Sequence, residues 1–202
     1  MTPFNKEMGA GLSVPLSEGD SIIQIQYHTG QNATALQWLS PEQTAGKKQP
    51  YLFTQCESIF ARSLLPCQDL PARRITYDAE VDVPVGMMAL MSAHNPVHKD
   101  SSGHYKFNME IPVPTYLIAL AVGDIEYQAL NERSGVYTEP CMLQQAAKEL
   151  EDIPAMMNAA EEIAGPYRWG TYDVLIAPPS FPIGGMENPR LTFATPTILA
   201  GD

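Results

Sequence analysis

The chain has 202 residues, with 23 Asp and Glu against 12 Lys and Arg and a formal net charge of −11 at pH 7. An acidic chain without a Lys/Arg cluster is a poor partner for nucleic acid. The sequence contains no run of about 18 apolar residues, so no membrane span is predicted. The first residues lack the pattern of a signal peptide. Three cysteines without a C-x-x-C pair indicate free thiols, and we expect a cytoplasmic protein.

The first part of the chain, residues 1–137, is rich in strand patterns. Apolar and polar residues alternate along Ser21–Thr29 and again along Arg74–Val83. A short helical turn is expected at Glu57–Ser63, ending before Pro66. Turn residues separate further short strand patterns, which are Met87–Ser92, Tyr105–Ile111, Tyr116–Val122, Ile125–Leu130 and Gly135–Thr138.

Helical patterns begin at Thr138. This threonine is predicted to cap a helix over Met142–Leu150, and Asp152 is predicted to cap a second helix that stops at Gly165. Strand patterns return at Thr171–Ala177 and Leu191–Thr195. The order helix, strand, loop and strand has α/β character.

The loop between these last two strands, Pro178–Pro189, is the most informative segment. Its sequence PPSFPIGGMENP combines prolines that stiffen the backbone, two adjacent glycines and one carboxylate, Glu187. Glycine allows another backbone to approach closely, because no Cβ intervenes. A peptide could lie along an exposed strand edge here, although a rigid surface loop would have the same local pattern.

The segment GGMEN resembles the exopeptidase signature G-x-M-E-N of the zinc aminopeptidases related to aminopeptidase N and leukotriene A4 hydrolase, which are gluzincin metallopeptidases. The surrounding sequence looks most like the leukotriene A4 hydrolase branch. The resemblance runs in order from about Thr34 to Asp202. Four other segments carry it: Ala35–Gly46, Tyr51–Glu57, Arg62–Asp69 and Gly165–Gly170.

The resemblance implies a role for each residue of the substrate site. Glu187, the catalytic-site glutamate of the signature, would bind the free α-amine of a peptide, and Glu57 would supply a second carboxylate. The main chain at Gly184 and Gly185 would run along the substrate, and Gln55 and Met186 would line the pocket for its first side chain. The full substrate-binding set is Gln55, Glu57, Gly184, Gly185, Met186, Glu187 and Asn188.

The chemistry of an amine clamp agrees with this assignment. A peptide α-amine has a pKa of about 7.7–8.0 and is mostly a cation near neutral pH. Two carboxylates on one ammonium give charge-assisted hydrogen bonds of roughly 1.5–3 kcal/mol each. Two differences from the animal leukotriene A4 hydrolases favour peptides over lipid epoxides as substrates. Those enzymes have Gln where this chain has Glu57 and Tyr where it has Ile183.

The zinc motif of the resembled family, H-E-x-x-H, does not occur in the sequence. The nearest pattern is His94-Asn-Pro-Val-His98, which lacks the glutamate and contains a proline that disfavours a continuous helix. We therefore expect no metal site in this chain, with zinc held by a full-length parent. On this interpretation the chain is an internal fragment and is inactive by itself.

These patterns together predict a mostly β, saddle-like N-terminal domain over residues 1–137, incomplete at its start. Residues 138–202 are predicted to open a thermolysin-like catalytic domain. The expected function is part of a zinc aminopeptidase acting on peptides with a free N-terminus. Three alternatives remain: a metal-free module that binds peptide N-termini, a parent with added epoxide hydrolase activity, and a purely structural β-domain. The sequence does not indicate an oligomeric state.

Overall fold

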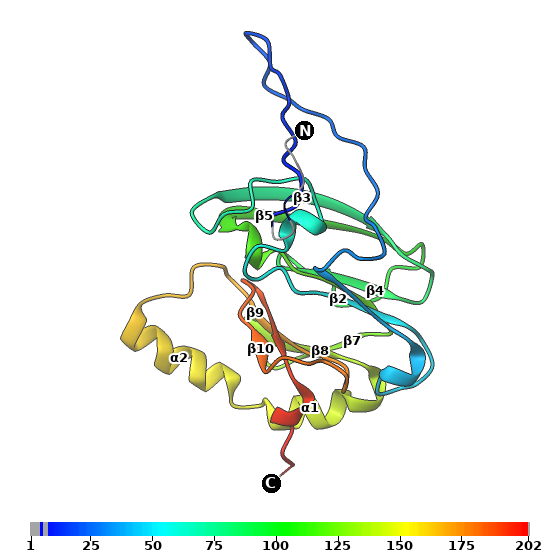
Figure 1. Cartoon of the computed structure of the whole chain (residues 1–202). Helices are drawn as coiled ribbons and strands as arrows, with labels where there is room; N and C mark the ends of the chain where they lie inside the picture. The colour runs from blue at the N-terminus through cyan, green and yellow to red at the C-terminus, as the bar shows by residue number, and fades with distance from the viewer. Residues whose placement is uncertain (1–4, 6–7, 202) are drawn as a thin grey trace.

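The computed structural model describes residue 5 and residues 8–201. Three β-sheets lie above one another; the first of two helices packs under the outer face of the last sheet, and the second extends to the side of it (Figure 1). A long arm formed by residues 8 to about 30 projects away from this body. Among the described residues, no helix is long and apolar enough to cross a membrane.

The first two sheets are antiparallel and come from the first part of the chain. The four-stranded sheet has the order β1-β2-β6-β4, and the two-stranded sheet pairs β3 with β5. All four residues of β2 are buried, because this strand lies inside its sheet and between layers. The bounds are β1 Leu36–Leu39, β2 Tyr51–Thr54, β3 Arg74–Asp82, β4 Met88–Met91, β5 His104–Pro114 and β6 Leu120–Gly123, with 3-10 turns at Pro41–Gln43, Ala61–Ser63 and Thr115–Leu117.

The third sheet has five strands in the order β10-β11-β9-β8-β7. Its three central strands run parallel, and its two edge strands run antiparallel to their neighbours. Both helices lie in the connection between the parallel strands β8 and β9, as a parallel pair requires a long crossover. The bounds are β7 Glu126–Ala129, β8 Ser134–Thr138, α1 Leu143–Glu149, α2 Ile153–Ala164, β9 Tyr172–Ile176, β10 Gly185–Met186 and β11 Leu191–Ala194, with 3-10 turns at Pro140–Met142 and Pro196–Ile198.

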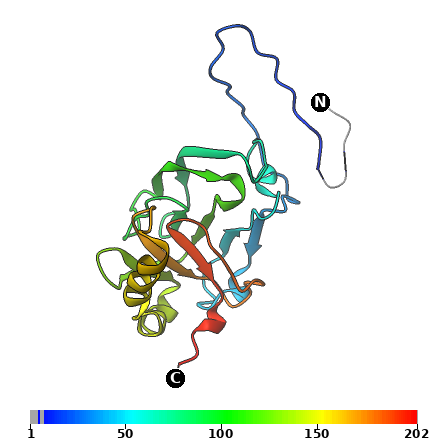
Figure 2. The ribbon, with the colours of Figure 1, turned by 90° about the vertical axis from the view of Figure 1, so that its left-hand side faces the viewer.

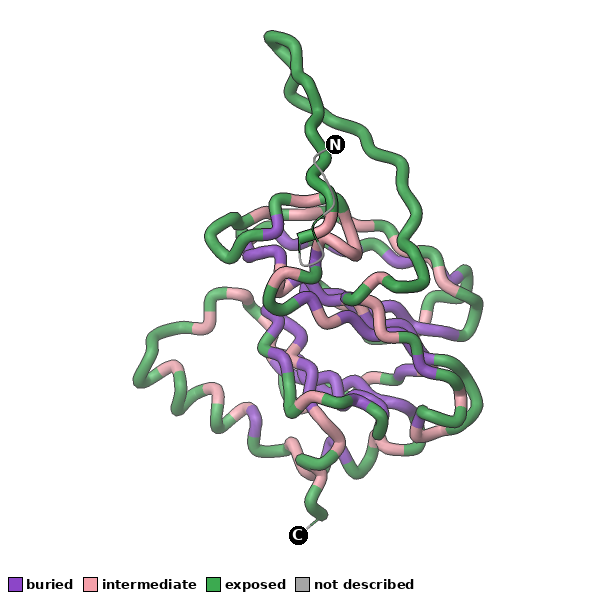
Figure 3. The backbone as a smooth tube through the Cα atoms, in the orientation of Figure 1, coloured by how far each residue is buried: buried purple, intermediate pink, exposed green. Residues whose placement is uncertain are grey.

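The five-stranded sheet is buried on both faces. Along β9, Leu175 belongs to the large core shared by all three sheets, whereas Val174 and Ile176 belong to a smaller core under the helices. This alternation follows from the period of two along a strand. Figure 3 shows the buried residues concentrated in the middle layers.

Most strands expected from the sequence are present, but neither predicted helix cap is confirmed. Thr138 does not cap the first helix, because it is the last residue of β8 and its hydroxyl donates to the carbonyl of Ile176 at 3.1 Å. Asp152 does stand at the N-terminus of α2, but its side chain makes no capping bond. Gly165 ends α2 with φ 83°, as expected of a helix-terminating glycine.

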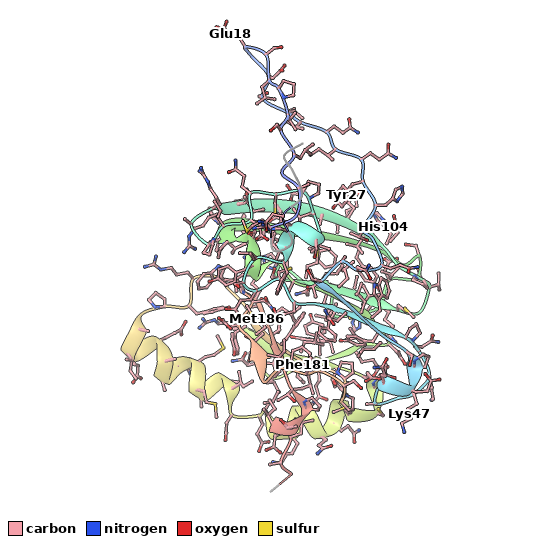
Figure 4. All side chains as sticks on the ribbon, viewed as in Figure 1. Glu18, Tyr27, Lys47, His104, Phe181 and Met186 are labelled. Carbon is pink, nitrogen blue, oxygen red and sulfur yellow. The ribbon has the colours of Figure 1, made fainter. Side chains whose placement is uncertain are left out.

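The prediction of a strand at Ser21–Thr29 is wrong. This segment belongs to the projecting arm, with Glu18 at its tip and Tyr27 near its return to the body (Figures 2 and 4). Its apolar residues are exposed, and Ile22 keeps 86% of its surface. Alternation of apolar and polar residues does not by itself form a strand, because the backbone N–H and C=O groups also need hydrogen-bond partners. No segment among the described residues pairs with it.

Candidate functional site

The GGMEN segment forms the free edge of the five-stranded sheet. Among the described residues, β10 is the outermost strand and pairs only with β11, with Gly185 opposite Ala194 and Met186 opposite Phe193. The sequence prediction of an exposed edge at this position is therefore confirmed. The segments predicted on either side of it, β9 and β11, are adjacent parallel strands of the same sheet.

One peptide N–H of this edge points away from the sheet. The carbonyl of Gly184 accepts a hydrogen bond from the N–H of Thr195 at 3.1 Å, so it faces β11. In a trans peptide the C=O and the next N–H point in opposite directions. The N–H of Gly185 therefore faces the free edge, where an extended peptide could accept from it.

The exposed face of this edge carries the predicted amine-binding carboxylate. Along the strand, Gly185 and Glu187 are exposed, whereas Met186 between them is 4% exposed and packs into the large core. Glu57, on the loop after β2, is also exposed. Neither Glu187 nor Glu57 has a hydrogen bond or ion pair from its carboxylate to another residue within the described part of the chain.

A ring contact joins the segments that carry these two glutamates. Phe53 of β2 packs edge-on against Phe181, with ring centroids 5.0 Å apart. Figure 4 shows Phe181 and Met186 in the same layer of the molecule. Ser180 adds a hydrogen bond from its hydroxyl to the carbonyl of Gln43 at 2.9 Å. The two segments are therefore neighbours, and the convergence of their carboxylates on one ammonium stays a prediction.

The other predicted site residues occupy different environments. Gln55 is half-buried, and its side-chain oxygen accepts from the N–H of Glu57 at 3.4 Å. Asn188 is 3% exposed, and its carbonyl accepts from the N–H of Leu191 in the turn that leads into β11. The substrate contacts assigned to Gln55, Met186 and Asn188 stay predictions.

Two features of this region escaped the sequence reasoning. Arg190 directly follows the signature and is buried, with its guanidinium bonded to Glu110 of β5 at 2.5 Å. Asp173 on β9 is 7% exposed, and burial raises the pKa of its carboxyl to about 7. A charged residue inside an apolar strand pattern was the only available signal for Asp173, whereas the partner of Arg190 lies eighty residues away.

No metal centre accompanies these groups in the described part of the chain. No cluster of three or more His, Cys, Asp or Glu is arranged to hold a metal ion there. His94 and His98 line a shallow surface hollow together with His104. His104 is occupied by an interaction of its own, because its Nδ1 lies 2.7 Å from a carboxylate oxygen of Asp82.

The two glycines of the edge are expected to respond differently to substitution. A Cβ on Gly185 would lie 2.9 Å from the carbonyl oxygen of Phe193, whereas a Cβ on Gly184 would meet no heavy atom within 4 Å. Gly185→Val should therefore strain the β10–β11 pair and lower the free energy of unfolding by about 1–3 kcal/mol. Gly184→Val should change it by less than about 0.5 kcal/mol.

Urea unfolding of both variants measures this difference. Equal stabilities would show that β10 shifts freely away from β11. The comparison also makes Gly184 the better probe of substrate contacts, since valine at Gly185 alters the protein's own sheet as well as the space beside it.

The part of the chain that forms most of the two antiparallel sheets corresponds to a known class of protein domain. The family model described as the peptidase M1 N-terminal domain matches residues 5–117, which is more than half of the chain. The chain therefore belongs to the M1 peptidase family. The family resemblance predicted from the sequence is confirmed.

Individual relatives extend the similarity beyond that domain. Leukotriene A-4 hydrolase of Xenopus laevis is 47% identical over 197 residues, which is 95% of this chain and 32% of that protein. Leucine aminopeptidase 2 of Yarrowia lipolytica is 47% identical over 196 residues, covering 95% of this chain and 30% of that protein. The structure of leukotriene A4 hydrolase from Saccharomyces cerevisiae superimposes with a TM-score of 0.79 at 43% identity, over 86% of this chain and 27% of that chain. The chain thus spans about a third of the length of these relatives.

Proposed function

We propose that this chain forms the amine-binding part of the substrate site of a zinc aminopeptidase that removes N-terminal residues from peptides. The observation that carries the proposal is an exposed, unpaired Glu187 directly after a free strand edge. An aminopeptidase relative that is 47% identical over the matched residues supports the substrate class. Since the chain spans about a third of such relatives, the activity belongs to the longer protein.

The proposed binding mode uses main chain for position and charge for selectivity. An extended peptide would add to β10 and accept a hydrogen bond from the Gly185 N–H. Its ammonium group would then reach Glu187, with Glu57 as the second carboxylate. Both carboxylates are solvated and unpaired in the described part of the chain, so they can exchange water for an ammonium without breaking an existing ion pair.

Peptides suit this site better than lipid epoxides. Glu57 would give the clamp a second negative charge, which favours a cationic amine over a neutral epoxide. Ile183 packs against the large core and presents no hydroxyl. Both residues depart from the animal leukotriene A4 hydrolases in the direction of aminopeptidase specificity.

The same proposal divides the chain into a saddle-like N-terminal domain, residues 1–137, and the opening of a thermolysin-like domain, residues 138–202. The parallel β8-α1-α2-β9 unit supports an α/β start for the second part. β7 precedes residue 138 and β8 ends at it, yet both share one sheet with β9, β10 and β11. The two proposed domains would therefore be joined through a continuous sheet.

Zinc would act elsewhere in the longer protein. The described residues offer no ligand set for it. Zinc would supply the activated water that attacks the peptide bond. The residues of this chain would hold the N-terminus of the substrate, so that cleavage falls after its first residue.

The substitution Glu187→Gln tests the amine clamp. Leucine amide has a free α-amine and no carboxylate, and N-acetyl-leucine amide is its blocked counterpart. We expect the purified chain to prefer leucine amide, and Glu187→Gln to weaken that binding about 10- to 100-fold, as expected for loss of a charge-assisted hydrogen bond of roughly 1.5–3 kcal/mol. NMR titration of backbone amides measures both dissociation constants.

Glu126→Gln is the matched control, because Glu126 is an exposed carboxylate on β7 at the opposite edge of the same sheet. It should leave both dissociation constants unchanged. Glu57→Gln should weaken the binding of leucine amide, as Glu187→Gln does. Equal binding of the free and acetylated compounds by the unmodified chain would remove the main support for the exopeptidase assignment.

A further inference from the structure

We propose that Arg190 is a positioning residue that fixes the angle of the GGMEN edge through Glu110 and Tyr167. This inference rests on the proposed function, because its consequence is the placement of Glu187 for an amine. It assigns a role to the segment Gly165–Gly170, which the sequence comparison singled out and the amine clamp does not use. Arg190 lies in the turn between β10 and β11, shortly after Glu187.

The conformation of Arg190 is costly. Its φ is 67°, in the left-handed region that disfavours residues with a Cβ. The residue is 2% exposed, so a charged guanidinium is also held away from water. A strained backbone and a buried charge at one position persist only where surrounding contacts determine them.

Three contacts from separate elements hold Arg190. Its N–H donates to the hydroxyl of Tyr167 at 3.1 Å, and its carbonyl accepts from the N–H of Asp173 on β9 at 3.1 Å. Its Nη2 donates to a carboxylate oxygen of Glu110 at 2.5 Å. The turn after the signature is thereby tied to the five-stranded sheet, to the loop after α2 and to the two-stranded sheet.

Glu110 is the principal restraint on the guanidinium. Within the described part of the chain, the buried Nε and Nη1 of Arg190 have no hydrogen-bond partner, so the ion pair with Glu110 is the bond that orients this side chain. Glu110 itself is half-exposed on β5. Loss of its charge would leave Arg190 buried and unpaired, which favours movement of the turn toward solvent.

Tyr167 is itself held firmly, so its hydroxyl is a fixed point. Its ring packs against Trp169 and Tyr172, with centroids 5.5 Å and 5.7 Å away. Its N–H donates to the carboxylate of Glu161 at 2.8 Å, and Arg133 pairs with the same carboxylate at 2.6 Å. The segment Gly165–Gly170 thus connects the end of α2 to the turn that carries Arg190.

This restraint matters because β10 is held on one side only. It consists of two residues and, in the part of the chain that the structure describes, has a single neighbouring strand, β11. The ladder alone leaves such an edge free to twist, and Glu187 lies just beyond the last paired residue. The anchored turn that follows therefore sets the direction of Glu187 and of the Gly185 N–H.

The variants Glu110→Gln, Arg190→Gln and Arg190→Lys test the inference on the whole chain. Glu80→Gln is the matched control, because it removes an exposed ion pair with Lys106 from the same two-stranded sheet. Hydrogen exchange at the Met186 amide, whose N–H faces β11 in the ladder, reports on the edge. The dissociation constant of leucine amide reports on the clamp, and urea unfolding reports on global stability.

We expect Glu110→Gln and Arg190→Gln to speed hydrogen exchange at the Met186 amide about tenfold. We expect the same variants to weaken the binding of leucine amide at least about fivefold. Arg190→Lys keeps a charged donor and should recover part of both losses. Glu80→Gln should change neither. Glu110→Gln keeps the inference falsifiable if the Arg190 variants do not fold, since Glu110 is half-exposed.

Unchanged exchange at Met186 in folded Glu110→Gln would overturn the inference. So would an altered urea midpoint with unchanged affinity of the folded protein for leucine amide, since that describes a structural role alone. If the unmodified chain does not distinguish leucine amide from its acetylated form, the amine clamp fails. A selective tenfold rise in exchange at Met186 then still supports the restraint of the edge by Arg190.

Discussion

Replacing Asp173 with asparagine is expected to raise the free energy of unfolding by roughly 3–4 kcal/mol at pH 8 and to change it little at pH 4. Burial is the main cause of the raised pKa of Asp173, and a backbone hydrogen bond from Gly135 opposes it only in part. Asparagine keeps an oxygen that can accept this bond and carries no charge. At pH 8 the substitution therefore removes the cost of burying a carboxylate.

The sign follows from the two pKa values. The pKa of Asp173 is about 7 in the folded protein and returns to about 3.9 on unfolding. Between these values the folded state holds the extra proton, so the stability that this group contributes is complete below pH 4 and is lost as the pH rises through 7. A separation of about three pH units corresponds to roughly 4 kcal/mol at most.

Urea unfolding at several pH values between 4 and 8 measures the effect as the difference between the two proteins. Other carboxylates titrate equally in both, including Glu161, whose pKa is lowered to about 2 by hydrogen bonds from the Arg133 side chain and the Tyr167 backbone and by the charge of Arg133. A constant difference across this pH range would mean that the Asp173 carboxyl keeps an ordinary pKa.

Truncating Phe181 to alanine is expected to lower the free energy of unfolding by about 3–5 kcal/mol. Phe181 is 6% exposed and belongs to the large core, where it meets Phe53 at a centroid distance of 5.0 Å. Alanine leaves a cavity where the Pro178–Pro189 loop joins β2. The same change should also loosen the contact between the segments that carry Glu57 and Glu187.

Phe60→Ala provides the control, because Phe60 is 41% exposed and should lose less than about 1 kcal/mol. Urea unfolding of Phe53→Ala, Phe181→Ala and the double variant isolates the pair itself, for which an aromatic contact contributes about 0.5–1.5 kcal/mol. A loss at Phe181 no larger than that at Phe60 would show that the loop does not depend on this contact.

Local patterns in the sequence determined much of the fold. The alternation along Arg74–Val83 became β3, and the apolar segment Thr171–Ala177 became β9. Gly165 ended α2 because a glycine reaches a positive φ without strain. Prolines, two glycines and a glutamate between two strand patterns identified the free edge and its candidate carboxylate. Period and turn chemistry act over a few residues, so a single sequence displays them.

Only the tertiary structure decided which of these patterns found partners. Ser21–Thr29 has the alternation of a strand and remains unpaired, whereas β1 and β2 were not recognised as strands and pair with each other. The bond between Arg190 and Glu110, the contact between Phe53 and Phe181, and the burial of Asp173 all join residues far apart in the chain. Their energies depend on what packs around each group, since burial changes both the strength of a hydrogen bond and the cost of a charge. The sequence by itself therefore determined the candidate edge and its chemistry, and the packing of three sheets decided how that edge is held.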